Sequence, residues 1–117
     1  MTTLLTRQTE DVLIAYFPDY RIVETSRITN LGQELAELAN NNQKIILNFE
    51  KVSFMSSAMI GKLVSFREKC DSAEVSMRMC GINENIEEVF KLLKLGKIFS
   101  LDSDEETAVR KLYEPSH

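Results

Sequence analysis

Two adjacent serines, Ser56 and Ser57, are the side chains of this sequence that best suit chemistry, because they stand where a strand passes into a helix. The stretch KVSFMSSAMIGKL covers residues 51–63, and its apolar residues take up helical spacing after the serines. Serine is favoured as a helix N-cap, where its hydroxyl accepts a hydrogen bond from a free backbone N–H. We therefore assign the cap to Ser56 and expect Ser57 to begin the helix.

A phosphate on Ser57 would suit this position in the helix. It would meet free N–H groups and the positive end of the helix dipole, so the fold would tolerate it. It would also add roughly two negative charges to a semi-polar surface. This position therefore favours a binding switch: phosphorylation would leave the fold unchanged but alter the charge of the surface that a partner contacts. The structural alternative, in which a serine of the first turn only stabilises the helix, stays open.

Familiar catalytic sites are poorly supported by the residues present. The one histidine, His117, is the last residue, so a Ser-His-Asp triad is not expected. The four glycines, at positions 32, 61, 81 and 96, form no phosphate-binding loop. Asn48 and Ser56 occupy the strand ends where paired carboxylates would hold a metal, and neither is charged. We expect no enzyme, no cofactor and no metal site.

The composition indicates one soluble domain spanning residues 1–117. With 117 residues, 44% of them hydrophobic, the chain can bury one core. A net charge of −4 argues against nucleic acid and against an anionic membrane surface. No apolar run approaches the roughly 20 residues that cross a bilayer, and the first residues lack a secretory pattern. We expect a cytoplasmic protein without membrane insertion, in which Cys70 and Cys80 are reduced and buried.

The hydrophobic periodicity predicts an alternation of strands and helices. Strands are expected at 11–17, 44–49, 74–80 and 98–101, with a weaker edge strand at 2–7, and helices at 24–40, 57–70, 83–93 and 102–113. The asparagine run 40–42 should end the first helix, Gly96 should mark the end of the third, and the acidic run DSDEE should be a solvated start of the fourth. This order predicts an α/β fold with a mixed, mainly parallel sheet of about five strands and about four helices.

Two segments resemble the STAS domain family. IILNFEKVSFMSSAMIGKL is similar to the family's pattern of an apolar strand, Asp, a short turn, V-x-F-I and then Asp-Ser-Ser-Gly-Leu-Gly. VSMRMCGINENIEEVFKLLKLGKIFSLDSDEETAV resembles the last third of that family. The likeness covers nearly the whole chain and is closest to the bacterial anti-sigma factor antagonists. It implies a STAS-like domain that regulates transcription by binding another protein.

The resemblance also implies a phosphorylation site. In this family a serine is phosphorylated by a kinase that is also the anti-sigma factor, and only the unphosphorylated form binds that partner. Position by position, the acceptor is Ser57, with Ser56 as the alternative, and Gly61 matches the second glycine of the pattern. The implied partner is thus an anti-sigma factor/serine kinase. We expect it to bind around Ser56, Ser57, Met59 and Ile60.

The chain departs from the family pattern at three of these positions. Ser56 replaces the Asp before the acceptor, Met59 replaces the first glycine, and Asn48 replaces the Asp at the end of the central strand. Met59 has two interpretations: an adaptable contact for the partner, or packing against Met55 or Phe66. Two alternative functions therefore stay open. One is a divergent STAS subunit that acts unphosphorylated in a signalling assembly or transporter complex, and the other is a small-ligand or nucleotide-binding protein.

Overall fold

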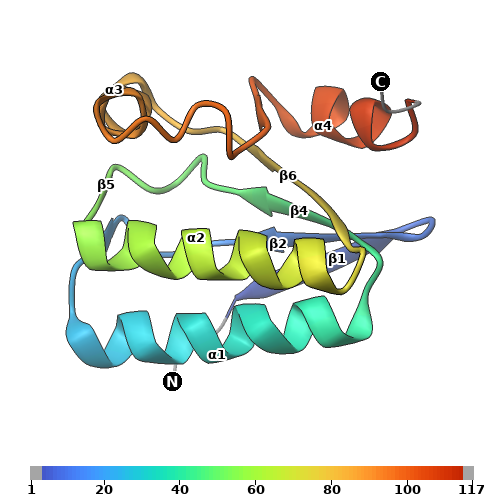
Figure 1. The fold of residues 1–117 in the computed structure, drawn as a ribbon, viewed down its shortest axis with the longest axis horizontal. Helices are drawn as coiled ribbons and strands as arrows, with labels where there is room; N and C mark the ends of the chain where they lie inside the picture. Colours follow the sequence, from blue (N-terminus) through green and yellow to red (C-terminus); the bar gives the residue numbers. More distant parts are fainter. Residues whose placement is uncertain (1–3, 115–117) are drawn as a thin grey trace.

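The computed structural model describes residues 4–114, which form an α/β fold (Figure 1). The elements follow one another as β1 (Leu5–Thr9), β2 (Val12–Tyr16), β3 (Arg21–Ile22), α1 (Thr25–Asn41), β4 (Lys44–Asn48), β5 (Phe54–Met55), α2 (Ser57–Ser72), β6 (Ser76–Cys80), α3 (Glu84–Leu92), β7 (Leu101–Asp102) and α4 (Glu105–Leu112). His117 and the first residues of the strand predicted at 2–7 lie outside the described residues. None of the helices in this part of the chain has the length and apolar character needed to cross a membrane.

The predicted sheet is confirmed. Its strand order is β1-β2-β4-β6-β7, in which β1 is antiparallel to β2 and the other pairs are parallel. Helices α1 and α2 lie side by side on one side of the sheet (Figure 1). Helix α4 packs on the other side, against β4, β6 and β7, whereas α3 contributes Ile86 and Phe90 to the same core as α1 and α2. This arrangement follows from the alternation of strands and helices, because each parallel pair needs a crossover that packs a helix on the sheet.

The sheet separates a large core from a small one. The large core lies under α1 and α2 and includes Ile45 and Leu47 of the central strand. Ile46, between them, points to the other face, where it meets Ala108 of α4. Strand β4 is therefore apolar on both faces, as its near-continuous run of apolar residues predicts.

A second sheet of two very short strands was missed by the sequence analysis. Strand β3 pairs with β5 in parallel, with Arg21 opposite Phe54 and Ile22 opposite Met55. Two residues are too few to produce a readable alternation of apolar and polar side chains. The pairing nevertheless matters for function, because it holds the chain just before the start of α2.

The helix ends differ in part from the prediction. Asn42 ends α1 with extended backbone angles instead of left-handed ones, and its side-chain amide donates a hydrogen bond to Leu38 O at 3.0 Å. Gly96 does not end α3; Lys94 adopts the left-handed conformation, with φ 60°. Leu95 N then donates to Phe90 O at 2.8 Å, as in a Schellman motif. The predicted helix end at residue 93 is within one residue of Leu92, but the left-handed residue that follows the helix is Lys94 instead of Gly96.

The acidic run 102–106 is not simply a solvated helix start. Asp102 ends β7, and its side chain is fully buried. Arg78 Nε donates to one of its carboxylate oxygens at 2.5 Å and Arg78 Nη2 to the other at 3.0 Å. The cap of α4 is Asp104, whose carboxylate accepts a hydrogen bond from Thr107 N at 2.8 Å. The prediction is wrong for Asp102, because a run of acidic residues does not reveal which of them pairs with a cation from another strand.

Gly81 offers a sharp test of this fold. Its φ is +74°, and a Cβ placed there would lie 2.9 Å from Glu50 N. We expect Gly81→Ala to lower the free energy of unfolding by about 2–4 kcal/mol, from left-handed strain and overpacking against backbone. Urea denaturation followed by circular dichroism measures the change.

Gly61→Ala is the matched control, because a Cβ at Gly61 of α2 meets no atom within 4 Å. We expect this variant to gain about 0.5–1 kcal/mol of stability from its helical position. Equal effects of the two substitutions would contradict the described path of the chain at Gly81.

Candidate functional site

Ser56 caps α2, as predicted. Its backbone is extended, and its Oγ accepts a hydrogen bond from Met59 N at 3.4 Å. Its own N–H donates to Ile22 O of β3 at 3.0 Å, and its carbonyl accepts the first helical bond, from Ile60 N at 3.1 Å. Ser56 therefore joins the small β3–β5 sheet to the helix, and its side chain is only partly accessible.

Ser57 is the first residue of α2 and points to solvent. None of the side-chain hydrogen bonds described for residues 4–114 involves its hydroxyl. The first N–H groups of a helix lack intrahelical partners and attract negative charge. The first turn of α2 contains no acidic residue that would repel a phosphate. The hydroxyl of Ser57 is thus accessible, and its surroundings suit a phosphate.

Met59 and Ile60 face inward. Met59 is fully buried in the large core, which also contains Met55 and Phe66. This burial supports the packing interpretation of Met59, and its side chain is not part of the exposed surface on which we expected a partner to bind. Helical geometry explains the difference, because residues two and three positions after the exposed Ser57 turn toward the sheet.

Ile60 can still be reached from outside through a small apolar pocket. The pocket has a volume of about 100 Å³ and lies between β5, the first turn of α2 and α3. Its lining comprises Ser53, Phe54, Met55, Ile60, Asn85, Ile86 and Val89. Phe54 and Val89 on its rim are 44% and 37% exposed, and Leu92, farther along α3, is 81% exposed. Exposed apolar groups around a pocket are typical of protein-binding surfaces.

The sequence analysis did not include the rim residues in the candidate site. Phe54 lies in the two-residue strand that the sequence pattern did not reveal, and Val89 lies in the predicted helix 83–93, for which no exposed face was predicted. The exposure of Phe54 follows from strand geometry, because the side chains of successive strand residues point to opposite faces. With Met55 buried, Phe54 must point outward.

Arg21 supplies positive charge beside this pocket. Its guanidinium carbon lies 4.8 Å from the centroid of the Phe54 ring, which is a cation–π contact. The register of β3 and β5 places Arg21 directly opposite Phe54, and Phe54 precedes Ser57 by three residues. The site thus combines an accessible hydroxyl, an apolar pocket and a cation on the exposed side of the small sheet.

Asn48 belongs to a separate polar cluster at the end of β4. The residue is buried, and its amide Nδ2 donates to Glu105 Oε1 at 3.2 Å. Tyr16 OH donates to the same oxygen at 2.6 Å, and Arg7 forms an ion pair with the other carboxylate oxygen. Asn48 Oδ1 accepts a hydrogen bond from Glu50 N at 2.9 Å. Burial, together with the hydrogen bond to Glu105, raises the pKa of the Tyr16 hydroxyl.

This cluster explains one departure from the family pattern. An Asp at position 48 would bring a second carboxylate against Glu105, and like charges at that distance repel. The amide of Asn48 instead donates to the Glu105 carboxylate and so ties β4 to α4. A pocket of about 190 Å³ lies beside Asn48 and Tyr16. The polar groups of these two residues already bond to Glu105 or to Glu50 N, and the pocket is also lined by Glu50 and Lys51.

The cysteines and acidic residues suggest no metal site. Cys70 and Cys80 are free and buried, as predicted. Burial raises the pKa of Cys70 to about 11 and that of Cys80 to about 12, so both remain thiols at neutral pH. Within residues 4–114, no three His, Cys, Asp or Glu side chains come together as metal ligands would.

Comparison with known proteins identifies the fold. The family model described as the STAS domain matches residues 6–108. Among solved structures, an anti-sigma-factor antagonist (STAS) domain protein from Planctomyces limnophilus superimposes with a TM-score of 0.85 at 16% identity, covering 95% of this chain and 98% of that one.

Two further structures widen the comparison. The phosphorylated form of SpoIIAA, a Bacillus cell fate determinant, gives a TM-score of 0.71 at 16% identity and covers 94% of this chain and 99% of its own. The murine anion transporter Slc26a9 gives 0.74 at 13% identity, with 90% of this chain matching 18% of the transporter. At these identities, the likeness supports the fold alone.

The two serines should differ in their effect on stability. Ser56→Ala removes the cap, and because the capping hydrogen bond is long we expect a loss of about 0.5–1 kcal/mol in the free energy of unfolding. Ser57→Ala removes an exposed hydroxyl without a described bond, so its effect should stay within about 0.5 kcal/mol. Urea unfolding of the two variants measures both values. A larger loss for Ser57→Ala than for Ser56→Ala would overturn the assignment of the cap.

Proposed function

Because the chain belongs to the STAS domain family, we propose that it is a regulatory protein-binding module of the anti-sigma factor antagonist type. In this proposal it binds an anti-sigma factor/serine kinase and is released when that kinase phosphorylates Ser57. The observation that carries the proposal is the place of Ser57, exposed at the start of α2 and close in sequence to the apolar pocket of Phe54, Ile60 and Val89. One surface can therefore hold both the acceptor and the partner.

The charge of a phosphate accounts for release of the partner. A partner that fills the apolar pocket must remove water from the surrounding surface, and burying an unpaired charge there is costly. A phosphate would add roughly two negative charges at that surface. The fold itself would tolerate them, because the free N–H groups of the helix start favour negative charge. Phosphorylation would thus weaken binding without unfolding the protein.

Arg21 gives the phosphate a further partner. Its contact with the exposed Phe54 ring is worth about 0.5–1 kcal/mol, whereas a hydrogen bond to a charged group is worth about 1.5–3 kcal/mol. The guanidinium would therefore leave the ring and pair with a phosphate on Ser57. This movement would change the rim of the pocket at the same time as the charge.

The main alternative is a divergent STAS subunit that acts without phosphorylation. Ser56, in place of the family's Asp, removes a charge that could position the nucleotide and metal of a kinase. The murine anion transporter with this fold shows the architecture within a much larger transport protein. In this alternative the pocket still binds a partner, and Ser57 is only a surface serine. A small-ligand function has less support, because Tyr16 and Asn48 beside the 190 Å³ pocket already bond to Glu105 and the four glycines form no phosphate-binding loop.

Mass spectrometry distinguishes the switch from this alternative. After incubation with ATP and an anti-sigma factor/serine kinase of the same organism, we expect the intact mass of the protein to rise by one phosphate. Ser57→Ala should abolish the rise, and Ser56→Ala, the matched control, should retain it. The phosphorylated serine can then be located by peptide fragmentation. An unchanged mass with every such kinase, together with unaltered partner binding by Ser57→Asp, would rule out the switch.

The apolar pocket is tested separately from the phosphate. Val89→Lys places a charge on the exposed rim of the pocket, and we expect it to weaken binding of the same anti-sigma factor at least tenfold, as for a residue in the centre of an interface. Isothermal titration calorimetry measures the dissociation constant. Leu5→Lys is the matched control, because Leu5 is an exposed apolar residue on β1 outside the pocket. Equal losses for both variants would show that the partner does not use this pocket.

A further inference from the structure

A groove between α1 and α2 is not used by the proposed switch. Its volume is about 320 Å³. Thr29, Gly32 and Ala36 line one wall from α1, and Lys62, Ser65 and Lys69 line the other from α2. On each helix these residues follow the spacing of a single face. Gly32 and Ala36 have small side chains, which leaves the space open.

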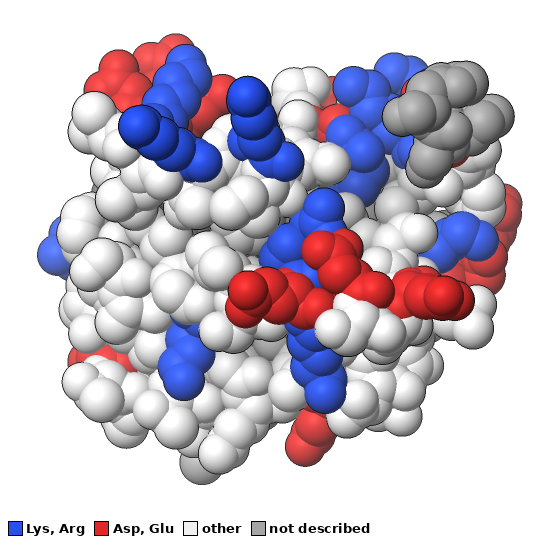
Figure 2. All heavy atoms as spheres, viewed as in Figure 1, with Lys and Arg blue, Asp and Glu red and all other residues white. Residues whose placement is uncertain are grey.

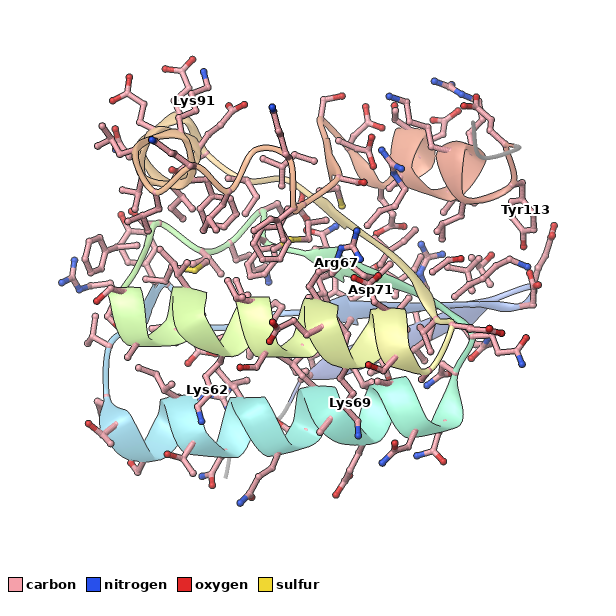
Figure 3. The ribbon with its side chains drawn as sticks, viewed as in Figure 1. Lys62, Arg67, Lys69, Asp71, Lys91 and Tyr113 are labelled. Carbon is pink, nitrogen blue, oxygen red and sulfur yellow. The ribbon has the colours of Figure 1, made fainter. Side chains whose placement is uncertain are left out.

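The two lysines reach across this groove toward α1 (Figure 3). A Cβ built on Gly32 would lie 3.0 Å from Lys62 Cδ and 3.5 Å from its Cε. The aliphatic stem of Lys62 therefore rests on the backbone of α1 at Gly32. Its ammonium group is held over the groove, because a long stem covers apolar surface while the charge stays in water.

Neither lysine has a carboxylate partner. The ion pairs of residues 4–114 do not include Lys62 or Lys69. On α2 no acidic residue stands three or four positions from either lysine, where an intrahelical pair would form. Figure 2 shows the face of the molecule on which α1 and α2 lie, where cations stand on surface that is largely uncharged apart from a row of carboxylates. An acidic protein thus presents two unpaired cations along one groove.

We propose that this groove binds an acidic helix of a protein partner. Lys62 and Lys69 are seven residues apart on a regular helix, so their Cα atoms are separated by about 10 Å along its axis. A helix with carboxylates at positions i and i+7 repeats the same spacing and can pair with both ammonium groups. Ser65, midway between the lysines, adds a hydroxyl for a polar contact.

The spacing favours a helix over a single small anion. One carboxylate or phosphate would occupy one lysine and leave the other unpaired. Exposed ion pairs are weak, each changing affinity on the order of two- to fivefold, so two pairs give roughly tenfold.

The test uses two synthetic helical peptides rich in Ala and Gln, which have the same composition. The first carries Glu residues along one face at i, i+4 and i+7, and the second distributes the same Glu residues around the helix. Titration of ¹⁵N-labelled protein, followed by amide chemical shifts, gives each dissociation constant. We expect the first peptide to bind about tenfold more tightly at low salt and to shift the amides of Gly32 and Ser65. This preference should disappear at high salt.

Four variants connect the effect to the groove. Lys62→Gln with Lys69→Gln should abolish the preference for the first peptide. The control with the same change in charge, Lys91→Gln with Lys97→Gln on and after α3, should retain it. Gly32→Ala should weaken the preference by displacing the Lys62 stem. Gly61→Ala, the matched glycine substitution with open space around its Cβ, should not.

Several outcomes would overturn the proposal. These are equal affinity for the two peptides, full binding by the double lysine variant, or shifts confined to other surfaces. Suberate tests the small-anion alternative, because the distance between its two carboxylates is similar to that between Lys62 and Lys69. If suberate bound as tightly as the first peptide and with the same shifts, the groove would be a small-anion site. The result does not depend on Ser57, because the test uses unphosphorylated protein throughout.

Discussion

The hydrogen bond from Ser56 N to Ile22 O fixes where α2 begins, and the functional surfaces depend on that point. The β3–β5 pairing brings the chain to Ser56, and the Ser56 cap starts the helix. An α-helix turns by about 100° per residue, so a start displaced by one residue would rotate every face of α2. Ser57 would lose its exposed place, Met59 would leave the core, and the lysines would no longer face α1. Two short strands and one cap therefore set the direction of a sixteen-residue helix.

Much of the fold could be predicted because its signals are local. The apolar runs and helical periodicities correctly give the number and order of the main-sheet strands and of the helices of residues 4–114. The bounds are wrong at the two sheet edges: β1 extends to Thr9, beyond the strand predicted at 2–7, and β7 shares only Leu101 with the strand predicted at 98–101. What failed depends on contacts between distant residues. The β3–β5 pair has too few residues for a pattern, and the burial of Asp102 depends on Arg78, twenty-four residues earlier. After α3 the left-handed residue is Lys94, which is neither Gly nor Asn, and local hydrogen bonds hold this turn, such as that from Leu95 N to Phe90 O.

The candidate site shows the same division. The roles of Ser56 as cap and Ser57 as exposed first residue follow from residue preferences at helix starts, which act within one turn. The apolar pocket could not be predicted, because β5, α2 and α3 form it together. Met59 illustrates the limit: its type permits both a core and a surface position, and only the phase of the helix decides between them. That phase is set by the short strands that the sequence did not reveal.

The hydrogen bond between Asn48 and Glu105 has a consequence for the evolution of this chain. The Glu105 carboxylate accepts hydrogen bonds from Asn48 and Tyr16 and forms an ion pair with Arg7. The cluster therefore joins β1, β2, β4 and α4. A carboxylate at position 48 is compatible with this cluster only when position 105 loses its charge, and the reverse also holds. The two positions, fifty-seven residues apart, are therefore epistatic. Asn48→Asp should therefore cost less stability in a chain that also carries Glu105→Gln than in this one.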